Sequence, residues 1–131
     1  MLAGRALFTI ISVLLLSGCS DARSRAKSTV KRVKATQLRK DVAIFYKDIF
    51  AGHRKTITTV NQQYWSWSFS QLHPDHITAY PDGFAFCLES IGDAESGLYV
   101  VPLGMDHDPA PTKWASFEKI SDGIFWYSFK P

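Results

Sequence analysis

Apolar residues recur at two different spacings along the chain, which divide it into a helical part and a strand-forming part. Leu38, Val42, Phe45 and Ile49 stand at i, i+4, i+7 and i+11, the spacing of an amphipathic helix with one buried face. Gly52 follows at a point where a left-handed residue commonly ends a helix. The pattern therefore predicts one amphipathic helix that ends before Gly52.

Beyond Tyr64, large apolar residues alternate with small or polar ones, and this period of two predicts strands. The predicted strands cover residues 65–69, 76–80, 84–90, 98–101, 114–120 and 124–129. Pro81 and Gly83 fit a tight turn between the second and third strands, and the pair Asp122-Gly123 fits one between the last two. We therefore expect two antiparallel hairpins.

The predicted elements define an α+β fold, in which an N-terminal amphipathic helix packs on an antiparallel sheet of five or six strands. Residues 35–131 form its single domain. A composition of 46% hydrophobic and 14% aromatic residues is that of a packed globule and not of a disordered chain. Residues 54–63 fit a strand and a short helix equally well, so their structure stays open.

The first 18 residues have the pattern of a secretory signal. The apolar run "ALFTIISVLLL", residues 6–16, follows the single cation Arg5, and it is too short to span a bilayer, which takes about 20 apolar residues. A charged start, a short apolar run and small residues are typical of a cleaved signal peptide. We therefore assign residues 1–18 to a signal peptide and exclude them from the fold.

Leu16-Ser17-Gly18-Cys19, at the end of this signal, resembles the lipobox of bacterial lipoproteins. The resemblance implies cleavage before Cys19, diacylglycerol on its thiol and a lipid anchor in the membrane. An aspartate directly after the cysteine favours the inner membrane in these proteins, but here Ser20 holds that position. The resemblance thus implies the periplasmic side of the outer membrane. The alternative is an ordinary signal peptide in which Cys19 is incidental.

The charge is distributed unevenly along the chain. Residues 19–60 contain eleven basic and three acidic residues, whereas residues 61–131 contain three basic and nine acidic ones. Val30 and Val33 do not continue the apolar stripe of Leu38, so we expect residues 19–34 to be a lipidated cysteine and a basic tether, or a solvated extension of the helix. Its cations could contact anionic lipid head groups, or they could serve only to keep the tether solvated.

Two loops carry residues that could bind a metal ion. His73, Asp75 and His76 lie in "LHPDH", and Asp106, His107 and Asp108 lie in "MDHDP". Imidazoles and carboxylates are ligands of Zn²⁺ and related ions, which need three or four such groups to converge. The alternative is that both stretches are solvated turns, where polar residues are common.

Catalytic motifs are absent from the sequence. No serine lies in a Gly-x-Ser-x-Gly elbow, and there is no Gly-rich phosphate loop or Cys-x-x-Cys pair. Cys87 lies between Phe86 and Leu88 in a predicted strand, where a buried, inert thiol is expected. We therefore expect no catalysis and no bound cofactor.

Four tryptophans could provide a binding surface or fill the core: Trp65, Trp67, Trp114 and Trp126. Together these features predict a lipid-anchored cell-envelope protein, a non-catalytic binding or accessory subunit with a protein partner. The alternative is a metal-binding or metal-dependent periplasmic protein that uses the two His/Asp loops. We expect no nucleic-acid partner.

Overall fold

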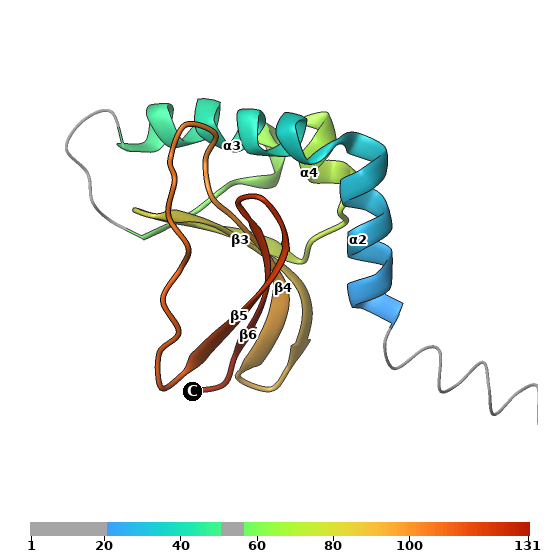
Figure 1. Cartoon of the computed structure of the whole chain (residues 1–131), viewed down its shortest axis with the longest axis vertical. Coiled ribbons are helices and arrows are strands. Elements are labelled where there is room, and N and C mark those ends of the chain that lie inside the picture. Colours follow the sequence, from blue (N-terminus) through green and yellow to red (C-terminus); the bar gives the residue numbers. More distant parts are fainter. Residues whose placement is uncertain (1–20, 51–56) are drawn as a thin grey trace, which may run out of the picture.

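The computed structural model describes residues 21–50 and 57–131 (Figure 1). It contains the helices α2 (Asp21–Val33), α3 (Ala35–Phe50) and α4 (Trp67–Gln71) and the 3-10 helix η1 (Gln62–Tyr64). The strands are β1 (Thr58–Thr59), β2 (His76–Tyr80), β3 (Gly83–Ile91), β4 (Ala94–Val100), β5 (Ala115–Ser121) and β6 (Ile124–Phe129). They form one antiparallel sheet in the order β1-β2-β3-β4-β6-β5, which confirms the predicted α+β fold.

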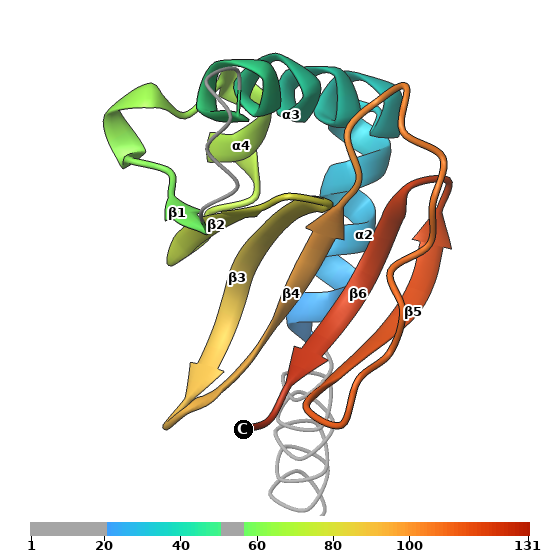
Figure 2. The ribbon, with the colours of Figure 1, turned by 90° about the vertical axis from the view of Figure 1, so that its left-hand side faces the viewer.

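The helices cover one face and one end of this sheet, and a long loop covers the other face. Figure 2 shows α2 behind the sheet, α3 across its upper end and the segment 101–114 in front. No helix within residues 21–50 and 57–131 is long and apolar enough to cross a membrane.

The first hydrophobic core lies between the helices and the sheet. Phe69 of α4 sits at its centre and contacts Phe86 edge-on, with ring centroids 5.1 Å apart. Around it pack Leu38 and Val42 from α3 and, from the sheet, Ile77, Phe84, Leu98, Val100 and Ile124. The helical stripe predicted from the sequence therefore faces the core as expected.

A second core lies on the opposite face of the sheet. Tyr99, Phe125 and Tyr127 are buried there, and Met105 of the segment 101–114 packs against them. Because both faces are covered, β6 carries large apolar residues on both of its sides: Ile124 contributes to the first core and Phe125 to the second.

The tether predicted for residues 19–34 is, from Asp21 on, the helix α2. Ala22, Ala26, Val30 and Val33 form a buried stripe along it, so α2 belongs to the domain. Lys34 has a φ of +71°, which ends α2 and redirects the chain into α3. The two stripes therefore belong to helices with different axes, which is why they do not align on a single helical wheel.

The strand predicted at residues 65–69 is also wrong, because η1 and α4 occupy this segment. Ser66 caps α4 by accepting a hydrogen bond from the amide of Phe69, as N-cap serines commonly do. Ser68 is fully buried and donates a hydrogen bond of 2.6 Å to Asp41. The alternating serines thus serve as a helix cap and a buried hydrogen-bond donor, not as the polar face of a strand.

Both predicted hairpins are present, with longer strands than expected in places. Tyr80 pairs with Gly83 across the first turn, and Gly123 has a φ of +71° in the second. The strand expected at 98–101 is β4 and already begins at Ala94. In residues 54–63, whose structure the sequence left open, β1 is followed by the start of η1. The predicted helix cap Gly52 lies outside the described residues.

Candidate functional site

The two His/Asp loops predicted to share a metal ion lie at opposite ends of β2. His76 begins β2, whereas Nε2 of His107 lies 2.8 Å from the carbonyl oxygen of Asp82, in the turn after β2. At about 3.3 Å per strand residue, the four steps from His76 to Tyr80 already separate the two ends of β2 by about 13 Å. The two loops therefore do not build one site.

His76 instead meets two residues that the sequence analysis did not connect with it. It pairs with Cys87 across the β2–β3 hairpin, and Glu95 reaches the same place from β4. The ligand atoms of His76, Cys87 and Glu95 all lie within 4.8 Å of one another, and Nε2 of His76 is 3.3 Å from Oε2 of Glu95. No other group of three His, Cys, Asp or Glu side chains converges in this way among the described residues.

A β-bulge positions these three side chains. The β3–β4 pairing shifts by one residue between Cys87 and Glu89, opposite Gly97. A Cβ atom on Gly97 would lie 1.8 Å from the carbonyl oxygen of Phe86, so only glycine allows the strands to approach this closely. The amide of Asp75 donates to the carbonyl oxygen of Cys87 at 2.8 Å and continues the hairpin pairing beyond β2.

The cluster combines a buried thiol with an oriented carboxylate. Burial, together with the nearby charges of Glu95 and Asp75, raises the pKa of the Cys87 thiol to about 11. The Tyr127 hydroxyl donates a 3.1 Å hydrogen bond to Oε1 of Glu95. Glu95 therefore holds Tyr127 with one oxygen and faces His76 with the other.

A nucleophile, a base and a carboxylate are also the parts of a cysteine-hydrolase triad, but Cys87 does not suit that role. The nucleophile of such an enzyme is a thiolate, formed where neighbouring positive charge lowers the thiol pKa. Here the thiol is fully buried, donates to the carbonyl oxygen of Glu89 at 3.4 Å and has a raised pKa. The buried, free Cys87 expected from the sequence is confirmed.

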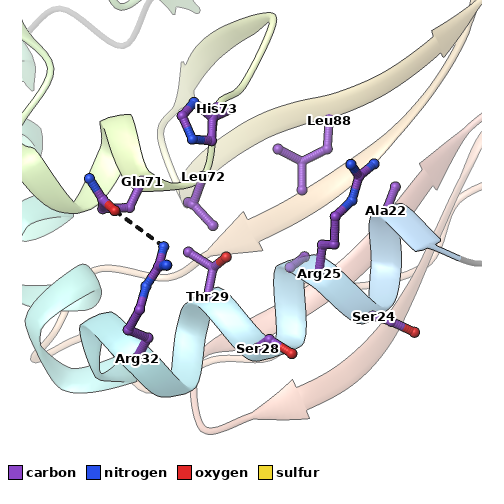
Figure 3. Close-up of a pocket in the computed structure, with 11 residues that line it drawn as sticks. Ala22, Ser24, Arg25, Ser28, Thr29, Arg32, Gln71, Leu72, His73 and Leu88 are labelled. Carbon is purple, nitrogen blue, oxygen red and sulfur yellow. Dashed lines mark hydrogen bonds between the residues drawn. The ribbon is translucent and has the colours of Figure 1, made fainter.

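A groove of about 570 Å³ separates α2 from the segment that joins α4 to β2. Figure 3 shows Arg25, Thr29 and Arg32 on the α2 side and Gln71, His73 and Leu88 on the other. Arg32 donates a 3.2 Å hydrogen bond to Gln71 and so bridges the two walls. His73 therefore lines this groove instead of joining the His76 cluster.

The four tryptophans divide between core and surface. Trp65 and Trp126 pack against the first core, and Nε1 of Trp65 donates to the carbonyl oxygen of Val60 at 3.1 Å. Trp67 and Trp114 remain 63% and 49% exposed. The latter two therefore expose most of the tryptophan surface, whereas Trp65 and Trp126 are partly buried.

The exposed tryptophans lie near opposite ends of the domain. Trp114 precedes β5 and lies beside Lys113 and Lys130. Ile91, the last residue of β3, is 83% exposed at the same end of the sheet. We call these four residues the basal end. Figure 1 places the start of α2 toward the same end of the domain. The segment 57–67 lies toward the other end, and its Tyr64 and Trp67 are both more than 60% exposed.

In comparisons with known proteins, no protein-family model, curated protein or solved structure matches this chain.

Proposed function

We propose that the chain is a lipid-anchored, non-catalytic binding or accessory protein of the cell envelope, whose domain stands directly on the membrane surface. The observation that carries this proposal is the position of α2. Asp21, the first described residue, already belongs to α2 and is two positions after Cys19, the residue proposed to carry the lipid. Two residues of chain reach at most about 7 Å, so the lipid would hold the domain close to the head groups.

The chemistry of the basal end supports this orientation. Tryptophan is favoured at the membrane interface, and an exposed isoleucine gains free energy by entering the acyl boundary. Lys113 and Lys130 add positive charge beside Trp114. Each cation gains about 1 kcal/mol near anionic lipids within a Debye length of about 8 Å, a distance comparable with the reach of the anchor.

Because α2 is a helix and not a flexible tether, its cations lie at different distances from the membrane surface. An α-helix rises 1.5 Å per residue, so Lys31 lies about 15 Å farther along the helix than Asp21. Arg23 pairs with Glu118 of β5. Contact with anionic lipid is therefore proposed for the basal end and the first turns of α2, not for the whole basic segment.

The segment 57–67 is the proposed surface for a protein partner. It would point away from the membrane when the basal end faces it, and it exposes Ile57, Tyr64 and Trp67. Exposed aromatic residues are common anchors of protein interfaces. The non-catalytic part of the proposal is supported by the burial and raised pKa of Cys87.

Metabolic labelling with radioactive palmitate tests the anchor. The wild-type chain should take up the label and stay in the outer-membrane fraction, whereas Cys19→Ala should do neither. Cys87→Ala is the matched control, because it removes the buried cysteine and should leave labelling unchanged. Equal labelling of wild type and Cys19→Ala would refute the proposal.

A further inference from the structure

Three side chains with different donor atoms meet on one face of the sheet. His76, Cys87 and Glu95 come from three adjacent strands and offer an imidazole nitrogen, a sulfur and a carboxylate oxygen. In a tetrahedral zinc site with bonds of about 2.0–2.3 Å, ligand atoms stand roughly 3.3–3.7 Å apart. The distance of 3.3 Å between Nε2 of His76 and Oε2 of Glu95 is already that of two zinc ligands.

We propose that His76, Cys87 and Glu95 bind a divalent transition-metal ion of the zinc class. The three ligand atoms lie within 4.8 Å of one another, so shifts of about 1 Å bring all three to bonding distance. Imidazole, thiolate and carboxylate together suit zinc, whereas Mg²⁺ and Ca²⁺ prefer oxygen ligands alone. This site differs from the one expected between the two loops, and it does not depend on the lipid anchor.

The neighbours of the cluster hold its ligands in place. The Tyr127 hydroxyl binds Oε1 of Glu95 and leaves Oε2 directed toward His76. Such hydrogen bonds to a ligating carboxylate are a common feature of metal centres. The backbone pairing of Asp75 with Cys87 and the bulge opposite Gly97 fix the strands that carry the ligands.

The charge around the thiol also favours a cation. Glu95 belongs to the cluster itself, and Asp75, whose amide donates to the carbonyl oxygen of Cys87 at 2.8 Å, is a second carboxylate directly before His76 in the sequence. On binding, the thiol would release its proton to solvent and the thiolate would bind the metal, because only the thiolate is a ligand. The metal would thereby place a positive charge between the Glu95 carboxylate and the Cys87 thiolate.

The site would keep one coordination position open. Three protein ligands leave the fourth tetrahedral position to water or to a small ligand. The side chain of His76 is 41% exposed, so this position is reachable from solvent although Cys87 is buried.

Calorimetric titration with ZnCl₂ of the full chain, purified in detergent and stripped with EDTA, tests the proposal. We expect one ion per chain with submicromolar affinity, and at least tenfold weaker binding by His76→Ala and by Glu95→Gln. His107→Ala is the matched control, since it removes a histidine outside the cluster, and it should bind like the wild type. Melting temperatures without metal verify that each variant is folded.

Cobalt substitution tests the thiolate separately. Co²⁺ should give a near-ultraviolet thiolate-to-metal absorption band in the wild-type chain, and Cys87→Ser should lack the band. Binding no tighter than about 10 µM, equal zinc affinity of wild type and His76→Ala, or a Co²⁺ complex without the thiolate band would each overturn the proposal.

Discussion

Shortening Val30 tests whether α2 is part of the folded domain or a solvated tether. Val30 is 4% exposed and belongs to the first core, so Val30→Ala removes two buried methyl groups. At about 0.8 kcal/mol per group plus a cavity term, the loss is about 1.5–3 kcal/mol. Alanine favours a helix over valine by about 0.5 kcal/mol, so the net loss of stability should be about 1–2.5 kcal/mol.

Urea unfolding followed by tryptophan fluorescence measures this loss, because Trp65 and Trp126 pack against the same core. For a domain of this size, the net loss corresponds to a decrease in melting temperature of about 4–10 °C. Lys31→Ala is the matched control, since it is the next residue of α2 and is exposed. A chain that starts at Ala35, without α2, should lose much more stability than either variant.

The opposite result would show that α2 does not pack as described. If Val30→Ala and Lys31→Ala both unfold within about 0.5 kcal/mol of the wild type, the typical range of surface substitutions, α2 contributes nothing to the domain. A chain starting at Ala35 that melts at the temperature of the full chain would lead to the same conclusion. Residues 19–34 would then be a basic tether, as the sequence predicts.

Three further predictions concern the loop over the second core, the thiol and the bulge. Arg39→Ala should cost about 2–4 kcal/mol, because the guanidinium donates to the carbonyl oxygens of Val101, Pro102 and Met105 at 3.0, 3.3 and 3.2 Å. Hydrogen exchange of residues 103–105 should accelerate, whereas Lys40→Ala should leave it unchanged. The pKa of Cys87 rises from 9.0 to about 11 on folding, so the folded chain keeps a proton that the unfolded chain loses. Stability should therefore fall as the pH rises from 9 to 11, by at most about 3 kcal/mol, and an equal fall in Cys87→Ala would exclude the thiol as a cause. Gly97→Ala should destabilise by several kcal/mol, because its Cβ would lie 1.8 Å from the backbone oxygen of Phe86. Gly92→Ala is the control: Gly92 has a positive φ, but no atom lies within 4 Å of its Cβ, so this variant should cost only about 1 kcal/mol. Equal melting temperatures for Gly97→Ala and Gly92→Ala would contradict the close strand approach at the bulge.

The candidate metal site was only partly predictable from the sequence. Once a tight turn is assigned at Pro81-Asp82, residues equally far from it face each other, so the predicted hairpin contained the information needed to pair His76 with Cys87, although this pair was not among the predicted metal ligands. Glu95 could not be added in the same way. Its position depends on the bulge between Cys87 and Glu89, and a single extra residue shifts every pairing beyond it.

The sequence by itself determined the helix and the strands whose apolar residues recur with the period of that one element. The stripe from Leu38 to Ile49 repeats the turn of a helix, and the alternation around Pro81 and Gly123 repeats the pleat of a strand. Each of these patterns is set by the residue's own element, so neighbours in sequence are sufficient to recognise it.

Only the tertiary structure decided the parts whose burial depends on distant residues. Ser68 is buried in α4, where Asp41, 27 positions earlier, accepts its hydrogen bond, and this partner cannot be recognised from the alternating residues 65–69. The apolar stripe of α2, which includes Ala26 and Val30, faces the first core because the chain turns at Lys34 between α2 and α3. In both cases packing overrode the local pattern, since burial against distant partners contributes more free energy than the propensity of a short segment.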